Sequence, residues 1–145
     1  MFSSETISTL CEIETLCYPD TIAYDTETMQ EILNQPGTLL ICEWREGTLA
    51  GFQLSDRLRG TIITIDVHPS FRRQGIARLL MIRSLQTLKA SGHKRVISEV
   101  AVDNIPSLLL HLKLGFKKRF TLKHYYGTGQ NAYRLVLEFK KSNKN

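Results

Sequence analysis

TIDVHPSFRRQGIARLL, residues 64–80, is the stretch that decides how this chain folds. It begins inside a β-branched run that is typical of a strand, and the run stops at a His-Pro-Ser turn. Two arginines and a glycine follow, after which a helix begins. This order directs the free backbone N–H groups of a helix N-terminus beyond the end of the strand, where they can bind an anion. Because Arg72, Arg73 and Arg78 add positive charge, the stretch predicts a diphosphate-binding loop.

The position of the glycine separates this loop from two common phosphate-binding loops. The nucleoside triphosphate pattern G-x-x-x-x-G-K-[ST] is absent from the sequence. The dinucleotide pattern G-x-G-x-x-G is absent too, because Gly75 is the only glycine of the loop. The pattern present is Arg72-x-x-Gly75-x-Ala77. Taken alone, it also fits an ordinary strand–turn–helix unit with a basic turn.

A second motif follows in the C-terminal half of the chain. Residues 96–102 form another β-rich run, which contains Glu99, and Asp103-Asn104-Ile-Pro-Ser then opens a short helix. The helix continues through residues 108–114 and ends at Gly115-Phe116. Two motifs at this separation are far more specific than either one alone.

Together, the two motifs resemble those of the GNAT family of acyl-CoA-dependent N-acetyltransferases, most closely the protein N-terminal and ribosomal-protein-alanine acetyltransferases. The resemblance covers residues 61–139. It implies an α/β fold with one mixed central β-sheet flanked by helices. It also implies transfer of an acetyl group from acetyl-CoA to a primary amine, by direct attack in a ternary complex. Members usually open with a short strand, but here a helix starts almost at Met1, so this first edge strand is expected to be missing.

The resemblance also implies which residues hold the coenzyme A part of acetyl-CoA. The loop would bind the diphosphate, mainly through backbone N–H groups. The end of the preceding strand, where the family's strand bulges, would bond the pantetheine arm, and the Val67 N–H would polarise the thioester. Asn104 would contact the cofactor arm and also cap the following helix. The cofactor-binding residues expected are Ile65, Val67, Arg72, Arg73, Gln74, Gly75, Ile76, Ala77, Arg78 and Asn104.

Two residues are candidates for proton transfer. Glu99 matches the carboxylate that ribosomal-protein-alanine acetyltransferases use as general base, through a water molecule. The alternative for Glu99 is an outward-facing strand residue. His111 stands where the family has a tyrosine that protonates the leaving thiolate, and an imidazolium can donate a proton near neutral pH. The alternative for His111 is a partly buried helix residue.

Four tyrosines are candidates for substrate recognition. Tyr18 and Tyr24 lie between the first two predicted helices, in a segment that resembles the groove lining of peptide-acetylating members. Tyr125-Tyr126 resembles the paired tyrosines that bind a peptide N-terminus, and its alternative is aromatic packing at a hairpin turn. The expected acceptor is therefore a protein or peptide α-amine. The alternatives are a small-molecule amine acetyltransferase, a non-catalytic coenzyme A-binding module and a nucleic-acid-binding protein.

Composition and charge fit a single globular domain over residues 1–145. The chain has 145 residues, of which 42% are hydrophobic, enough for one core. Its net charge of +5 is concentrated in Arg72-Arg73, Lys117-Lys118-Arg119 and the lysine-rich tail. No apolar run reaches the ~20 residues of a membrane span, and the N-terminus lacks the layout of a signal peptide. The three cysteines are expected to be buried or idle thiols in the cytoplasm.

Periodicity and turn residues place the elements along the chain. Helices are predicted over residues 5–16, 26–33, 75–90 and 105–114, and strands over residues 38–44, 48–54, 61–67, 95–102, 116–124 and 132–139. The third helix is expected to bury Ile76, Leu79, Leu80, Ile82, Leu85 and Leu88. We expect no metal site, no nucleic-acid partner and no membrane contact, and either a monomer or a homodimer.

Overall fold

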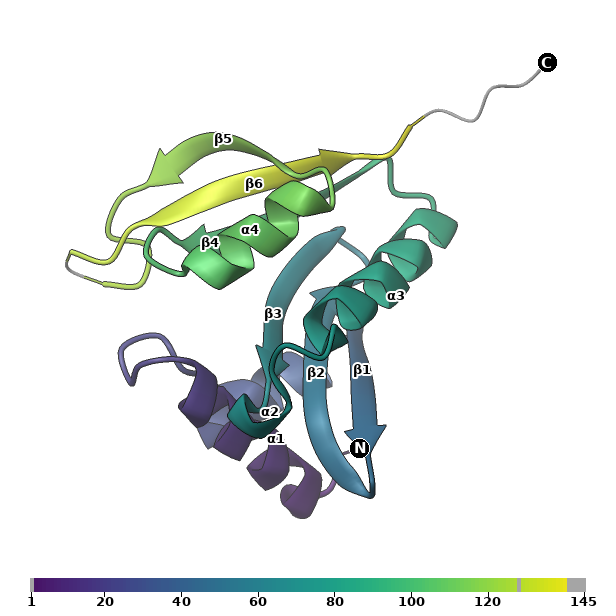
Figure 1. Ribbon diagram of the computed structural model, residues 1–145, viewed down its shortest axis with the longest axis vertical. Helices are drawn as coiled ribbons and strands as arrows, with labels where there is room; N and C mark the ends of the chain where they lie inside the picture. The colour runs from purple at the N-terminus through teal and green to yellow at the C-terminus, as the bar shows by residue number, and fades with distance from the viewer. Residues whose placement is uncertain (1, 128, 141–145) are drawn as a thin grey trace.

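Six strands and four α-helices make up residues 2–127 and 129–140, the part of the protein that the computed structural model describes (Figure 1). The helices are α1 (Ser4–Cys17), α2 (Thr26–Asn34), α3 (Ile76–Ala90) and α4 (Ile105–Lys113). The strands are β1 (Thr38–Arg45), β2 (Thr48–Asp56), β3 (Thr61–Val67), β4 (Arg95–Ala101), β5 (Lys117–Leu122) and β6 (Ala132–Glu138), and a 3₁₀ turn, η1, covers Pro69–Phe71. Every predicted element is present, and the ends differ from the predicted ones by at most two residues.

The strands form one mixed sheet in the order β1-β2-β3-β4-β6-β5. Neighbouring strands are antiparallel, except that β3 and β4 run parallel. These two strands pair at only two positions, Thr61↔Ile97 and Ile62↔Ser98. Beyond them β3 and β4 separate, as the ribbon shows (Figure 1), and the sheet opens into a wedge at its centre.

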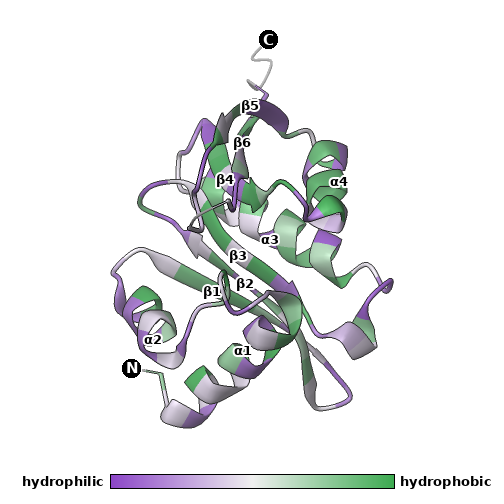
Figure 2. Cartoon of the chain, turned by 90° about the vertical axis from the view of Figure 1, so that its left-hand side faces the viewer, coloured by the Kyte–Doolittle hydropathy of each residue, from purple (hydrophilic) through white to green (hydrophobic). Residues whose placement is uncertain are grey.

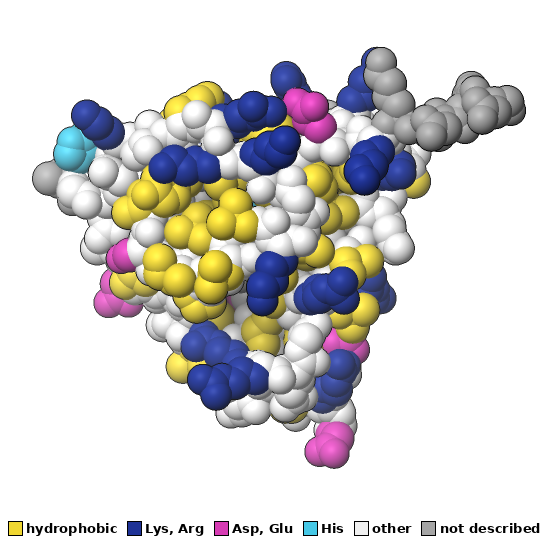
Figure 3. Space-filling view, turned by 45° about the horizontal axis from the view of Figure 1, so that its top comes forward, with side chains coloured by type: hydrophobic (Ala, Val, Ile, Leu, Met, Phe, Trp, Pro, Cys, Tyr) yellow, Lys and Arg dark blue, Asp and Glu magenta, His cyan; other side chains and the backbone are white. Residues whose placement is uncertain are grey.

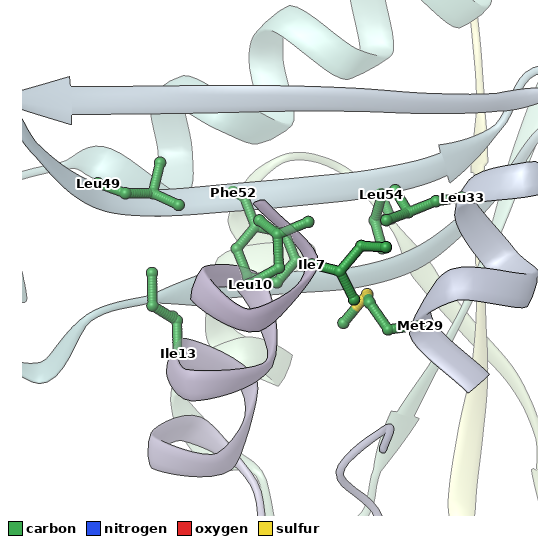
Figure 4. Packing of buried hydrophobic residues seen from close by; sticks show 8 residues of the cluster. All are labelled: Ile7, Leu10, Ile13, Met29, Leu33, Leu49, Phe52 and Leu54. Atoms are coloured by element: carbon green, nitrogen blue, oxygen red, sulfur yellow. The ribbon is translucent and has the colours of Figure 1, made fainter. Parts of the chain in front are cut away.

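Helices cover both faces of the sheet, with α1 and α2 on one face and α3 and α4 on the other. Figure 2 shows hydrophobic residues concentrated on the central strands and on the helix sides turned toward them. α4 is hydrophobic on its outer side as well. The core under α1 and α2, drawn in Figure 4, consists of Ile7, Leu10, Ile13, Met29, Leu33, Leu49, Phe52 and Leu54. Burial of these side chains fixes the two helices against β2.

A glycine in β2 lets α3 approach the sheet closely. A Cβ atom at Gly51 would lie 2.7 Å from the carbonyl oxygen of Asp66, and 3.2 and 3.3 Å from the side chains of Ile76 and Leu80. Any larger residue at this position would therefore push the start of α3 away from the sheet. The loop between β3 and α3 depends on this close packing for its position.

The buried side of α3 differs from the predicted one. The residues that it buries are Ile76, Leu80, Met81, Ser84, Leu85 and Leu88. Leu79 is exposed and Ile82 is only half-buried, so both predictions were wrong, and Met81 was missed. The helix turns one continuous face toward the sheet, and Leu79 lies at the edge of that face although it is apolar.

The irregular position of β3 also differs from the expected one. Leu54↔Thr64 and Ser55↔Ile62 are consecutive pairs with β2, so the bulge lies at Ile63, before the expected residues Ile65 and Val67. A bulge places two successive side chains on one face of a strand. Ile63 and Thr64 both face α1 as a result. As expected, no strand precedes α1 within the described residues.

The three cysteines, Cys11, Cys17 and Cys42, are free and partly buried. Burial raises the pKa of Cys17 to about 11, so this residue remains a protonated thiol near neutral pH. That state fits the expectation of an idle cysteine. Within residues 2–127 and 129–140, no helix combines the length and the apolarity that crossing a bilayer requires.

Candidate active site

A cavity of about 520 Å³ lies in the wedge between β3 and β4. Its walls are residues 61–65 of β3, residues 98–101 of β4, the segment between α1 and α2, the start of α4 and part of the segment between β5 and β6. The predicted site residues that line it are Tyr18, Tyr24, Ile65, Glu99, Asn104, His111, Tyr125 and Tyr126. Both proton-transfer candidates and all four tyrosines therefore meet in one cavity.

Glu99 enters the cavity from β4, and Arg134 of β6 holds one side of its carboxylate. Arg134 Nη2 and Nε donate to Oε1 at 2.8 and 3.1 Å. The two residues are direct cross-strand partners in the sheet. Among the described residues, no hydrogen bond reaches Oε2 of Glu99. One carboxylate oxygen is thus fixed in place, while the other is left to accept a proton.

Three tyrosines surround the Glu99 side of the cavity. The rings of Tyr125 and Tyr126 meet edge to face, with 4.8 Å between their centroids and 89° between their planes. Burial raises the pKa of Tyr24, Tyr125 and Tyr126, that of Tyr24 to about 12, and the nearby Glu99 carboxylate raises all three further. Near neutral pH the three hydroxyls keep their protons and can donate hydrogen bonds to a substrate.

His111 is 1% exposed, and both of its ring nitrogens are hydrogen bonded. Nε2 lies 2.9 Å from Ser98 Oγ, and Nδ1 lies 2.7 Å from the carbonyl oxygen of Ser107. The Phe116 ring packs edge to face against the His111 ring, with 4.9 Å between the two ring centroids. Burial lowers the pKa of His111, while the hydrogen bond to Ser107 raises it by less. The side chain is therefore a core residue that also reaches the cavity.

The loop before α3 leaves backbone N–H groups free at the helix start. Gly75 is the N-cap, in the left-handed region with φ 75°, and the first helical bond joins the Leu79 N–H to the Gly75 carbonyl. The N–H groups of Ile76, Ala77 and Arg78 precede that bond, so they have no acceptor within the helix. A Cβ atom at Gly75 would meet no other atom within 4 Å. The space beside Gly75 is open, and free N–H groups at a helix N-terminus are groups that can bind a phosphate.

Side chains of this loop have different surroundings. Those of Arg73, Gln74 and Arg78 are exposed. Arg72 turns back toward the strand, where Nε donates to the Val67 carbonyl at 3.4 Å and Nη2 lies 3.7 Å from Cys17 Sγ. Ile76 is 2% exposed and belongs to the core, so only its backbone N–H can face a ligand.

Side chains from the end of α1 hold the edge of β3, where the pantetheine arm was expected. The Tyr18 hydroxyl donates to the Ile65 carbonyl at 2.8 Å, and Cys17 Sγ donates to the Val67 carbonyl at 3.3 Å. Ile65 and Val67 thus direct their main-chain groups away from β2 and toward the wedge, as alternate residues of an antiparallel strand do. Asn104, at the opposite wall, caps α4 by accepting the Ser107 N–H at 3.3 Å.

Two buried carboxylates beside the cavity were missed by sequence reasoning. Glu14 and Asp66 are each 1% exposed, and Thr64 Oγ1 donates to Asp66 Oδ1 at 2.7 Å. Glu14 Oε2 accepts the Tyr24 N–H at 3.0 Å, which fixes the segment between α1 and α2. Spacing in the sequence could have predicted the burial of Glu14, because Glu14 lies seven residues after the buried Ile7 and so on the same helix face.

The buried carboxyl group of Asp66 should make the stability of the protein depend on pH. Burial, with the neighbouring Glu14, raises the pKa of Asp66 well above its usual range, so the folded protein holds a proton that the unfolded chain has lost above about pH 4. Stability from this group therefore falls as pH rises from that value toward the folded-state pKa. Asp66→Asn should remove this loss and raise the free energy of unfolding by about 1–3 kcal/mol at pH 7.

Urea denaturation at pH 4, 5.5 and 7 would measure this effect. The gain from Asp66→Asn over the wild type is expected to increase with pH. Glu12→Gln makes the same chemical change at an exposed position of α1 and is expected to give no such trend. A difference between Asp66→Asn and the wild type that stays constant across the pH range would contradict the prediction.

Basic side chains outnumber acidic ones on the surface formed by α4, β5 and β6, and apolar side chains lie between them (Figure 3). Exposed residues of this part of the protein include Ile105, Leu109, Leu112, Lys113, Lys117, Lys118 and Arg119. With a net charge of +5 on the whole chain, this surface contributes a positive field that attracts polyanionic ligands.

The profile described as the Acetyltransferase (GNAT) family matches residues 7–116 of this chain. The chain therefore belongs to the GNAT family of acetyltransferases, as its two sequence motifs predicted. The cofactor predicted from those motifs, acetyl-CoA, is the one that acetyltransferases of this family use.

Individual relatives and solved structures agree with this membership. An N-alpha-acetyltransferase of Sulfurisphaera tokodaii is 38% identical over 79 residues, which are 54% of this chain and 47% of that protein. The match thus spans about half the length of that relative. The ribosomal-protein-S18-alanine N-acetyltransferase from Escherichia coli has a TM-score of 0.84 at 21% identity, covering 99% of this chain and 94% of that one. An aminoglycoside 6'-N-acetyltransferase complexed with coenzyme A has a TM-score of 0.79 at 14% identity, covering 97% and 95%. The predicted fold is confirmed.

Proposed function

We propose that this protein transfers the acetyl group of acetyl-CoA to the N-terminal α-amine of a protein or peptide. The observation that carries the proposal is the cavity in the wedge between β3 and β4, in which Glu99 meets Tyr24, Tyr125 and Tyr126. The name of the Sulfurisphaera tokodaii relative, an N-alpha-acetyltransferase, supports an α-amine as the acceptor.

Acetyl-CoA, when bound, supplies an acetyl group activated as a thioester. The free N–H groups of residues 76–78, with Arg73 and Arg78 beside them, would hold its diphosphate. Main-chain groups of Ile65 and Val67, together with Asn104, would hold the arm within the wedge. Arg72 would add positive charge beside the diphosphate while its Nε donates to the Val67 carbonyl at the end of β3.

Glu99 serves as the general base in this proposal. Its Oε2 would take the proton that the attacking amine loses, directly or through a water molecule, while Arg134 keeps Oε1 in place. A free α-amine, with a pKa near 8, needs only a modest base, whereas a lysine amine near 10.4 needs a stronger one. His111 would be the source of the proton that the leaving thiolate acquires. Attack is direct, without a covalent enzyme intermediate.

Tyr24, Tyr125 and Tyr126 would recognise the peptide N-terminus through their hydroxyl groups and ring faces. Tyr18 would contribute its ring to the same cavity, since its hydroxyl is bonded to β3. We also place the protein in the cytoplasm, since the three cysteines are free thiols, as a reducing compartment keeps them.

Thiol release from acetyl-CoA tests the proposed function. The acceptors compared should be peptides with free N-termini, peptides with a blocked N-terminus and a free lysine, and polyamines. Turnover confined to free N-termini, with initial-rate patterns of a ternary complex, is the expected result. Turnover only on polyamines would indicate a small-molecule enzyme, and ping-pong kinetics would rule out direct attack. Acetyl-CoA binding without turnover on any acceptor would indicate a non-catalytic binding module.

A further inference from the structure

Ser98 lies at the end of the short stretch over which β4 pairs with β3. It is the last residue of β4 that pairs with β3, through Ile62↔Ser98, so its side chain lies where the wedge begins to open. Ser98 is 2% exposed and lines the same cavity as Glu99 and His111. Its Oγ lies 2.9 Å from His111 Nε2. Both ring nitrogens of His111 are engaged in hydrogen bonds, and the partner of Nε2 is a hydroxyl that also lines the cavity, so a proton can pass from the ring through Ser98.

We propose that the Ser98 hydroxyl is the immediate proton donor to the leaving thiolate, and that His111 acts through Ser98 by supplying the proton that it loses. This inference rests on the proposed acetyl transfer and names the residue that the reaction needs on the thiolate side. His111 is then a positioning and proton-supplying residue, and Ser98 is the catalytic one.

The bonds of the His111 ring determine when Ser98 can donate. Nδ1 lies 2.7 Å from the Ser107 carbonyl oxygen, which can only accept a hydrogen bond, so Nδ1 carries a proton. In the neutral ring, Nε2 then carries no proton and accepts a hydrogen bond from the Ser98 hydroxyl. In the imidazolium, Nε2–H donates to Ser98 Oγ instead. The Ser98 hydrogen is thereby released to point into the cavity.

Strand geometry separates the acid from the base. Successive side chains of a strand point to opposite faces, so Ser98 turns toward His111 of α4 while its neighbour Glu99 turns toward Arg134 and the tyrosines. In the proposed reaction the amine would lose its proton on the Glu99 side and the thiolate would leave on the Ser98 side, so each side would have its own proton-transfer group.

The proton transfers balance. Glu99 takes the proton that the amine nitrogen loses as it forms the new C–N bond. Ser98 Oγ–H gives its proton to sulfur as the C–S bond breaks and the electron pair stays on sulfur. His111 Nε2–H gives its proton to Ser98 Oγ, which leaves His111 neutral. Solvent then returns the proton from Glu99 to His111, and the enzyme is restored.

The groups around His111 predict how the reaction depends on pH. The side chains that hydrogen bond to the ring or pack against its face are Ser98 from β4, Ser107 from its own helix and Phe116, and none of these three is charged. Burial lowers the pKa of His111, so the imidazolium is lost as pH rises through a value below the usual 6.5. Turnover by the wild type should therefore fall about tenfold per pH unit above that pKa.

Ser98→Ala tests the proposal, with Ser84→Ala as the matched control. Ser84 is also fully buried and hydrogen bonded to another hydroxyl, Ser55 Oγ at 2.7 Å, but it lies on α3 and outside the cavity lining. Ser98→Ala is expected to lower kcat by about 100-fold, to leave the KM for acetyl-CoA unchanged, and to abolish the fall in turnover with pH. His111→Gln is expected to abolish that fall as well, because glutamine does not titrate.

NMR titration of the His111 ring, in protein without acetyl-CoA, gives a second readout. Ser98→Ala should lower the pKa of His111 by about 1 pH unit, because the imidazolium loses the acceptor of a charge-assisted hydrogen bond. A variant Ser98→Ala with wild-type kcat and pH profile overturns the proposal, provided that the wild type acetylates a peptide. Absence of turnover in the wild type overturns the proposed function instead, so the two failures are distinct.

Discussion

Glu99→Gln is expected to lower kcat for acetyl transfer by about 10²–10⁴-fold, the usual contribution of a general base, and to leave acetyl-CoA affinity unchanged. Glutamine keeps the shape of the side chain and an oxygen that can accept from Arg134, which donates to Oε1 at 2.8 and 3.1 Å. What it loses is the ability of Oε2 to take a proton. Steady-state kinetics on a peptide acceptor and calorimetric titration with acetyl-CoA measure the two quantities separately.

Glu43→Gln is a matched control for this variant. Glu43 is also a strand carboxylate paired with arginines, and its side chain is 16% exposed against 17% for Glu99. It lies on the edge strand β1, away from the cavity lining, so its replacement should cost stability without loss of turnover. Full activity of Glu99→Gln would show that another group takes the amine proton, and Glu14, which also lines the cavity, would be the next residue to replace.

Local signals in the sequence were sufficient for the architecture. The capping residues Ser3, Asp25 and Asn104 each accept a hydrogen bond from the N–H three residues later, and such caps are visible in sequence because they depend on near neighbours. Positions within α3 were harder, since apolar residues on several sides of the helix left its buried face ambiguous. Leu79 was therefore assigned to the core and Met81 was not.

Contacts between distant segments could not be predicted from local pattern. Tyr18 was expected to meet a substrate and does line the cavity, but the bond of its hydroxyl to Ile65, 47 residues away, could not be predicted. Arg72 was expected at the diphosphate, and its hydrogen bond to the end of β3 could not be predicted from the loop sequence. The pairing of Ser98 with His111 depends on how α4 crosses the sheet. Residue type indicated the chemistry of the site, whereas the direction of each side chain is set by the packing of α1 and α4 onto the strands.

Gly75→Val is expected to weaken acetyl-CoA binding about 10–100-fold. At φ 75°, a β-branched side chain is strained by about 1–3 kcal/mol, and relief of this strain moves the backbone. The N–H groups of residues 76–78 then lose their alignment, and each charge-assisted hydrogen bond to a phosphate is worth about 1.5–3 kcal/mol. Because a Cβ atom here meets nothing within 4 Å, the loss arises from backbone direction and not from a clash.

Gly92→Val separates loss of the loop from loss of stability. Gly92 follows the other end of α3, has φ 95° and is equally open, so valine there should cause a similar strain. Urea denaturation should show comparable destabilisation of the two variants, while calorimetric titration with acetyl-CoA should show weakened binding only for Gly75→Val. Equal loss of acetyl-CoA affinity in Gly75→Val and Gly92→Val would mean that binding depends on the stability of α3 as a whole. The free N–H groups at the start of α3 would then not be the diphosphate site, and the exposed arginines beside them would have to carry that binding.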